Sequence, residues 1–216
     1  MNSKLRKWIR WIKAINDEIQ KMKLYRYIFW EVQGIIKNNV KLHKPSAFKE
    51  FLAHNYGIHI LMMIRRQCKS DKQSISVRRL LEEMKRSPEI VTRDYFVSLY
   101  KPSTRELGNE HFDSYAGQNK DYVSPESIEK DLADLKSQLQ KCEKFADRTI
   151  AHIDIRKGSA IIPTFADLDR AIDFLVNICN NYHVLLTAES YYEGPPIFQY
   201  DWKAIFRVPW IENRQS

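Results

Sequence analysis

The sequence predicts an all-α protein. Only six of its 216 residues are glycine, while lysine, glutamate, isoleucine and leucine are abundant, which favours helices over a turn-rich β fold. Apolar residues recur at steps of three and four along most of the chain, which is the period of one helix face. A chain of this length can bury a sizeable core and is expected to form one main unit, with or without an appendage.

The first predicted helix is basic and amphipathic, and we expect residues 1–43 to pack on the rest of the bundle or on a partner. Charged residues interrupt it repeatedly, so it lacks the continuous apolar core of a signal peptide. No run of about 18 apolar residues occurs in the chain, so no transmembrane segment is predicted. Its apolar stripe consists of Leu5, Trp8, Ile9, Ile12, Ile15, Ile19 and Met22.

The central part of the chain, residues 44–190, is predicted to be a helical bundle. Ser46 is a suitable N-cap for a helix whose apolar middle should lie in the core. That helix ends in Arg65 and Arg66, so this pair of cations should lie at a core boundary. Residues 102–123 show no sustained period and are expected to be irregular.

Two long helices at the end of this bundle are predicted to form an antiparallel hairpin. Ser124 marks the start of the first, whose apolar face continues to Ile153, with Gly158 as a stop. Thr164 opens the second, and Asp167 three residues later completes a variant of the capping box. Short connections between long helices favour antiparallel neighbours.

The last segment, residues 191–216, breaks the helical pattern. Its three prolines exclude a continuous helix, and its aromatic side chains are too numerous to remain in water. We therefore expect an extended aromatic arm that covers the helical body or a partner subunit. The aromatic residues are Phe198, Tyr200, Trp202, Phe206 and Trp210.

The composition and the absence of common motifs limit the classes of function that the chain can have. A net charge of +8 and a pI near 9.3 point to a polyanionic partner such as nucleic acid, or to an acidic protein. No GxGxxG, P-loop, HExxH or GxSxG motif occurs, which excludes the common nucleotide-binding, metalloprotease and hydrolase classes. Three widely spaced cysteines without a CxxC pair indicate reduced thiols in a cytoplasmic protein. His54 and His59 are five apart and diverge on a helix, so no metal or other cofactor is predicted.

Residues 145–158, "FADRTIAHIDIRKG", contain a candidate RNA-cleaving pair. Arg148 and His152 are four apart and would share one face of an α-helix. An imidazole that titrates near neutral pH can take a proton from a ribose 2′-hydroxyl, and a guanidinium can hold the phosphate as charge develops. The same spacing is common by chance, and an ordinary charged helix end also carries such cations.

The hairpin sequence "DRTIAHID" followed by "TFADLDRAIDFLVNICNNYHVLLTA" resembles the HEPN superfamily, in the branch named after type U abortive-infection proteins. "MIRRQCKSDKQSISVRRLLEEM" and "IFQYDWKAIFRVPWI" resemble the same branch, and the likeness covers residues 45–211. The resemblance implies a helical bundle that forms a homodimer, with arginine and histidine of both protomers in one cleft. Many members are metal-independent endoribonucleases of toxin–antitoxin or antiphage systems, and several pair with a nucleotidyltransferase-like antitoxin.

The resemblance assigns roles with one departure. His152 matches the family histidine, which implies the acid–base role, and Asp147 matches the polar residue that often follows the motif arginine. The arginine position itself then falls on Ala146, which is vacant. Asp147 or Asp154 would orient the site.

Three explanations of the vacancy are open. Either Arg148 serves from a shifted register, or Arg65 or Arg66 supplies the cation from the core helix. Otherwise the chain is a noncatalytic subunit that binds nucleic acid or protein through a degenerate motif. In the catalytic hypothesis Lys144 and Asp154 complete the RNA-binding set.

Overall fold

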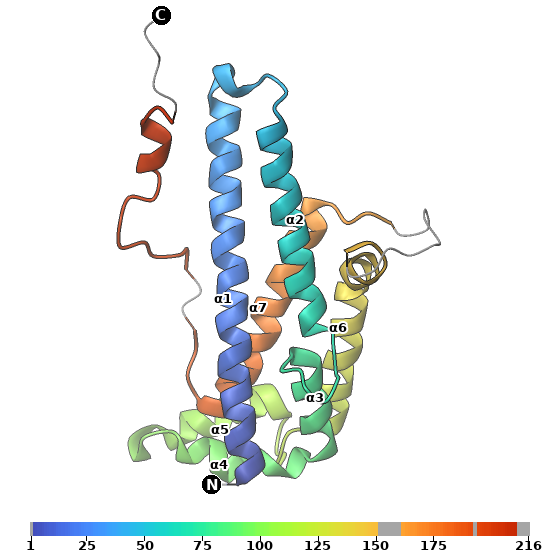
Figure 1. Ribbon diagram of the computed structural model, residues 1–216. Helices are drawn as coiled ribbons and strands as arrows, with labels where there is room; N and C mark the ends of the chain where they lie inside the picture. Colours follow the sequence, from blue (N-terminus) through green and yellow to red (C-terminus); the bar gives the residue numbers. More distant parts are fainter. Residues whose placement is uncertain (1, 151–160, 192–193, 211–216) are drawn as a thin grey trace, which may run out of the picture.

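A computed structural model confirms the all-α prediction. It describes residues 2–150, 161–191 and 194–210, and within these it contains seven α-helices and no β-strand (Figure 1). None of the described helices is long and apolar enough to cross a bilayer. The helices are α1 (Ser3–Asn38), α2 (Ala47–Gln67), α3 (Val77–Arg86), α4 (Arg93–Ser98), α5 (Arg105–Ala116), α6 (Pro125–Phe145) and α7 (Phe165–Thr187).

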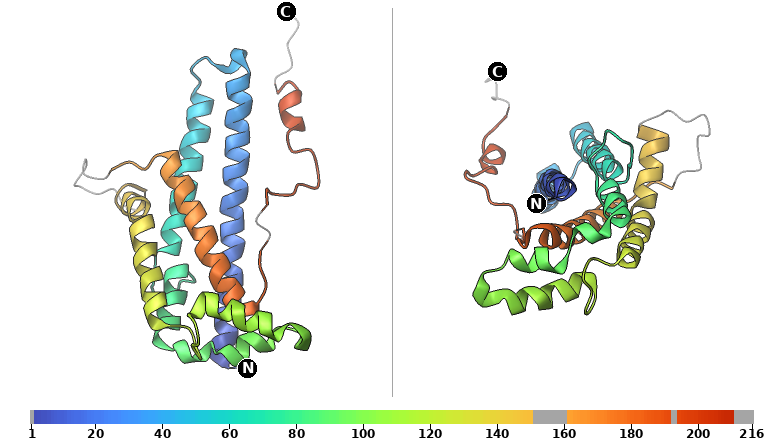
Figure 2. Two further views of the ribbon diagram at one scale, coloured as in Figure 1. Left: turned by 180° about the vertical axis from the view of Figure 1, so that it is seen from behind. Right: turned by 90° about the horizontal axis from the view of Figure 1, so that it is seen from below.

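Helix α7 lies at the centre of the bundle and contacts α1, α2, α4, α5 and α6 (Figures 1 and 2). The long helix α1 packs along it through the apolar stripe expected from the sequence. Each fully buried aliphatic side chain contributes about 1.5–3 kcal/mol, so this contact stabilises the fold more than any cap or ion pair. The buried residues of the stripe are Leu5, Trp8, Ile12, Ile15, Ile19 and Met22.

Helices α6 and α7 run in opposite directions, as a hairpin requires (Figure 1). Both starts are capped by the side chains that the sequence indicated: Ser124 Oγ accepts a hydrogen bond from the Ser127 amide, and Thr164 with Asp167 forms a capping box. The end of α6 differs from expectation. The α-helix stops at Phe145, and residues Ala146–Ile150 form a π-helical turn, labelled η4.

The prediction that residues 102–123 are irregular is wrong, because α5 occupies Arg105–Ala116. Its buried residues Gly108, Phe112 and Ala116 are four apart and face the core, where Phe112 packs against Phe96 with ring centroids 5.6 Å apart. A Cβ atom at position 108 would come within 2.9 Å of the Tyr100 ring, so glycine permits this close approach. A glycine at one of only three core positions weakens the apolar period that the sequence presents.

The C-terminal arm lies against α1 and α2 of its own chain. Tyr27 of α1 contacts the rings of Phe198 and Trp202, and Glu31 forms an ion pair with Lys203. The described residues of the arm contain one short 3₁₀ helix, η5 (Ala204–Arg207), and beyond it Trp210 contacts Phe48 of α2. The division at residues 43/44 and 190/191 into three domains remains a prediction.

Removing the capping box of α7 tests how much the start of this helix contributes to the stability of the fold. Replacement of Thr164 by alanine deletes the acceptor of the Asp167 amide, and we expect it to lower the free energy of unfolding by about 1 kcal/mol. Ser46→Ala is the matched control, because Ser46 occupies the N-cap of α2 without a side-chain cap bond; we expect a change below about 0.5 kcal/mol. Urea denaturation measures both, and equal losses would contradict the role of the box.

Candidate functional site

The π-helical turn η4 is the structural feature around which the predicted site residues gather. It follows α6 directly, and Ala146 at its start is fully buried. π-Helical turns change the angular register of the residues they contain and are frequent at functional sites. Here the turn places Asp147 and Arg148, adjacent in sequence, next to different neighbours.

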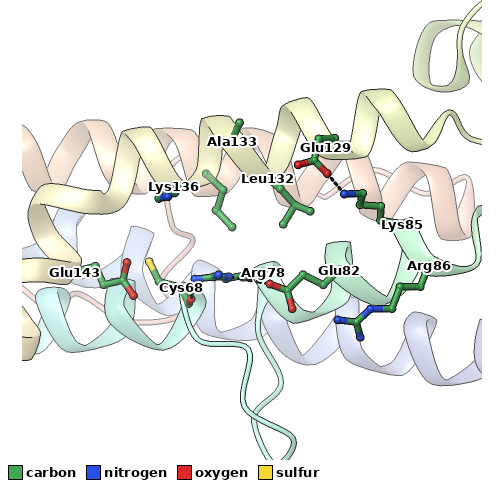
Figure 3. A pocket seen from close by; sticks show the side chains of 11 residues that line it. Cys68, Arg78, Glu82, Lys85, Arg86, Glu129, Leu132, Ala133, Lys136 and Glu143 are labelled. Carbon is green, nitrogen blue, oxygen red and sulfur yellow. Dashed lines mark hydrogen bonds and ion pairs between the residues drawn. The ribbon is translucent and has the colours of Figure 1, made fainter.

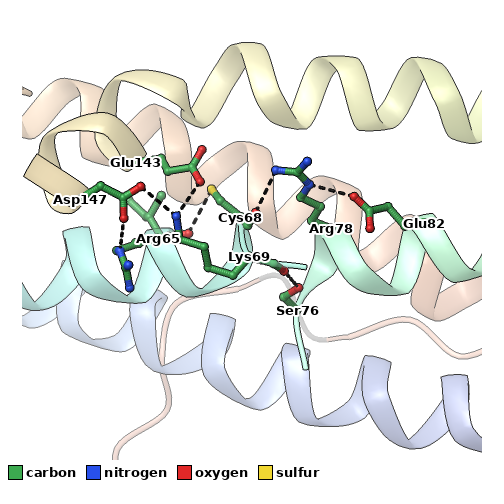
Figure 4. A network of polar contacts seen from close by, with 9 residues as sticks. Arg65, Cys68, Lys69, Ser76, Arg78, Glu82, Glu143 and Asp147 are labelled. Atoms are coloured by element: carbon green, nitrogen blue, oxygen red, sulfur yellow. Dashed lines mark hydrogen bonds and ion pairs between the residues drawn. The ribbon is translucent and has the colours of Figure 1, made fainter. Parts of the chain in front are cut away.

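Asp147 binds two cations, Arg65 of α2 and Lys69 just beyond the end of that helix. Its Oδ1 accepts a hydrogen bond from Arg65 Nε at 2.5 Å, and its Oδ2 accepts one from Lys69 Nζ at 2.8 Å (Figure 4). Lys69 Nζ also donates to Glu143 Oε1 at 3.0 Å. Arg65 and Lys69 are four residues apart, and so are Glu143 and Asp147, although Lys69 follows the end of α2 and Asp147 lies in η4. We call these four residues, Arg65, Lys69, Glu143 and Asp147, the α2–η4 clamp.

The clamp favours the charged forms of Asp147 and Lys69. Burial alone would raise the pKa of Asp147, but the hydrogen bonds from Lys69 and Arg65 lower it below its ordinary value. Burial alone would lower the pKa of Lys69, but its bonds to Asp147 and Glu143 raise it. Two cations and two carboxylates cancel in formal charge, so Arg65 is compensated where it stands.

Arg66 contacts a different helix from its neighbour Arg65. Its Nε donates to Glu18 Oε1 of α1 at 2.6 Å, and Gln67 donates to the other oxygen of the same carboxylate at 2.5 Å. The Arg66 side chain is 51% exposed, whereas Arg65 is 24% exposed. The two arginines predicted as alternatives therefore differ in surroundings, and Arg65 is the one that the structure brings to Asp147.

Lys144 and Arg148 line a pocket of about 360 Å³ at the end of α6. We call it the α6 basic pocket. A third cation, Lys141, also lines it and binds Asp167 at 2.5 Å, a bond that lowers the pKa of that carboxyl below its ordinary value. The remaining lining residues offer hydroxyl, amide, aromatic and aliphatic groups: Ser137, Gln140, Phe145 and Ile161.

The predicted residues that the structure describes thus divide among three surroundings, because Arg66 pairs with Glu18 of α1. Arg65 and Asp147 meet in the clamp, whereas Lys144 and Arg148 share the basic pocket. His152 and Asp154 lie outside the described residues. Lys69, Glu143 and Lys141 were not among the residues predicted from the sequence. Lys69 and Glu143 are four residues from Arg65 and Asp147, but this spacing does not say which two helix faces meet.

A groove of about 560 Å³ lies beside the clamp, between α3 and α6 (Figure 3). Its charges are mixed, and ion pairs join Arg78 to Glu82 and Lys85 to Glu129. Cys68 at its edge is buried, and burial raises the pKa of its thiol to about 12. A thiol of that kind is not a thiolate nucleophile at neutral pH.

The described part of the chain contains no group of three or more histidine, cysteine, aspartate or glutamate side chains that could hold a metal ion.

A comparison with protein families finds one described as HEPN_AbiU2: AbiU2, whose sequence model matches residues 5–205. The match includes most of α1, which the likeness seen in the sequence did not cover. Neither the search of curated proteins nor the search of solved structures found a significant match.

Replacing Asp147 by asparagine tests the clamp. The change removes the charge that Arg65 and Lys69 contact, and screening at a side chain that is 35% exposed should keep the loss near 1 kcal/mol. Because the folded pKa of Asp147 is lowered, its stabilisation is complete above about pH 5 and disappears as the pH falls below about 4. Urea denaturation of wild type and D147N across this range measures the difference.

Asp173→Asn is the control for this prediction. Asp173 also binds one arginine, Arg26 at 2.5 Å, but its side chain is 62% exposed. We expect its loss to stay below about 0.5 kcal/mol. A D147N effect no larger than that of D173N, or one independent of pH, would show that the clamp does not stabilise η4.

Proposed function

The chain belongs to the AbiU2 family of HEPN proteins, an abortive-infection family, and from this we propose that it is a metal-independent endoribonuclease of a toxin–antitoxin or antiphage system. The observation that carries the proposal is the α6 basic pocket, where Lys144 and Arg148 lie immediately before the segment that contains His152. The pocket is concave and its size suits a phosphate with part of a nucleotide.

The proposed reaction is an internal transesterification. The His152 imidazole takes the proton of a ribose 2′-hydroxyl, whose oxygen attacks the adjacent phosphorus while the bond to the 5′-oxygen breaks. The protonated imidazole returns this proton to the leaving 5′-oxygen, and the products are a 2′,3′-cyclic phosphate and a 5′-hydroxyl. DNA lacks the attacking group, so the activity is specific for RNA.

Arg148 is the cation that the geometry supports best for this reaction. It lines the pocket with Lys144, and a guanidinium there can donate to phosphate oxygens as negative charge develops. Arg65 and Arg66 lie outside this pocket, Arg65 beside Asp147 and Arg66 beside Glu18. In this proposal Asp147 fixes the backbone of η4 through the clamp, and Asp154 orients the histidine.

We propose further that the protein acts as a homodimer in the cytoplasm. The family likeness supports the dimer, with the arginines and histidines of two protomers around one cleft. Three buried cysteines without a disulfide fit a reducing compartment. A nucleotidyltransferase-like antitoxin is the protein partner that the likeness implies.

One observation favours a second candidate function, a noncatalytic subunit that binds nucleic acid or protein. The vacant motif position, Ala146, is fully buried, so an arginine there would have to displace core side chains. The core around position 146 therefore does not accommodate the arginine that the family motif usually has there. A degenerate motif that retains the basic pocket would bind RNA without cutting it.

RNA cleavage in excess EDTA tests the catalytic proposal. We expect a 2′,3′-cyclic phosphate product, a loss of roughly 100-fold or more in rate for His152→Ala, and a loss of roughly 10-fold or more for Arg148→Ala. Arg10→Ala, at an exposed position of α1, is the control and should cut like wild type. Equal rates for wild type and H152A would exclude this site, and dependence on added metal would exclude the mechanism.

RNA binding separates the two candidate functions. An RNA whose riboses carry 2′-O-methyl groups cannot be cleaved, so its affinity reports binding alone. Replacing Lys144 and Arg148 together by alanine should weaken binding and reduce the slope of log affinity against log salt by about 0.7 for each cation. Fluorescence anisotropy measures the slope, and an unchanged slope would show that phosphate does not occupy the basic pocket. Binding with this signature but no cleavage would favour the noncatalytic function.

A further inference from the structure

The far ends of α1 and α2 form a hairpin that projects beyond α6 and α7 (Figures 1 and 2). Near its tip, two neighbouring hollows of about 680 and 390 Å³ open between the two helices and the C-terminal arm. They share five lining residues and so form one continuous trough, which we call the tip groove. The shared residues are Val32, Phe48, Leu52, Phe206 and Trp210.

The lining of the tip groove is mostly apolar and is contributed by three separate segments. Helix α1 supplies Val32 and its neighbours, α2 supplies Phe48 and Leu52, and the arm supplies Phe206 and Trp210. Phe48 and Trp210 contact each other with ring centroids 5.9 Å apart, yet they remain 51% and 59% exposed. Large apolar side chains gathered in a hollow and left this exposed are typical of a protein interaction site.

The surroundings of the groove are basic. Residues 32–55 contain four lysines and one carboxylate, Glu50. Lys41, Lys44 and Lys49 line the groove itself, while Lys37 belongs to the same hairpin. None of these four lysines forms an ion pair with a carboxylate in the described part of the chain, although Lys49 donates to the Leu42 carbonyl.

We propose that the tip groove is a docking site for an acidic amphipathic segment of a partner protein. An amphipathic helix can place apolar side chains in such a trough, as in other helix-in-groove complexes, while its carboxylates meet the lysines. A second copy of this chain fits less well, because it would bring like charges together. A lipid surface does not reach the floor of a concave groove. The proposal does not depend on RNA cleavage.

A designed peptide tests the chemistry of the occupant. The probe is a fluorescein-labelled helical peptide with leucine and phenylalanine on one face and glutamate on the other, titrated with the full chain. We expect saturable binding that is lost in a second peptide with lysine in place of each glutamate. Phe48→Ser should weaken binding roughly tenfold or more, because it removes a shared wall of the groove.

Phe51→Ser is the matched control. Phe51 is 59% exposed on the same helix but lines neither hollow. The affinity of the F51S variant for the acidic peptide should therefore differ from that of wild type by less than about twofold. The double change Lys41→Glu with Lys44→Glu should weaken binding roughly fivefold or more, whereas Lys72→Glu with Lys101→Glu should not. The charge variants leave the apolar lining intact, and circular dichroism checks that every variant is folded.

Four results would overturn the proposal. The two peptides could bind equally, which would show apolar contact without charge recognition, or F48S and F51S could behave alike. Absence of peptide binding together with Phe48-dependent association with phosphatidylserine vesicles would identify a lipid surface as the occupant. Absence of peptide binding together with Phe48-dependent self-association in sedimentation experiments would identify a second copy.

Discussion

Burial of α7 against its neighbours is the interaction on which the rest of the structure depends. Ten of its side chains are buried, and α1, α2, α4, α5 and α6 all touch it. At about 1.5–3 kcal/mol for each large aliphatic group, this packing outweighs the roughly 1 kcal/mol expected of a cap or a partly exposed ion pair. The apolar contacts therefore fix where α2 and α6 stand, and the charged groups pair within that frame.

The α2–η4 clamp illustrates this order of causes. Once α2 and α6 lie side by side, Arg65 and Lys69 at the end of α2 meet Glu143 and Asp147 at the junction of α6 and η4. Their charges cancel, which removes Arg65 as an uncompensated cation for an incoming phosphate. Lys144, one position after Glu143 in sequence, instead lines the basic pocket. The same end of α6 thus presents a neutral structural contact on one face and a basic hollow on another.

Local signals made much of the fold predictable. Caps such as Thr164, apolar stripes such as that of α1, and the family resemblance each depend on residues close in sequence or on their pattern. Helix α5 was not predicted because Gly108 occupies one of its core positions. Glycine is there because the Tyr100 ring packs closely against it, and no local sequence pattern encodes that contact. The π turn and the partners of Arg65 and Arg66 were not predicted either, because they depend on which helix faces meet. Within the site, residue types were predictable and their pairing was not.

The positive charges of this molecule lie in different surroundings and suit different anionic partners. Around η4, Lys144 lies next to hydroxyl, amide and aromatic groups, a lining that suits a phosphate and a base. At the hairpin tip, Lys41 and Lys44 border a groove of apolar side chains, which suits a protein segment with carboxylates beside its apolar face. A net charge of +8 cannot distinguish these cases, because it counts cations without their neighbours. The side chains beside each cation decide which anion it can bind: polar groups in a small pocket favour nucleic acid, and a continuous apolar groove favours a protein segment.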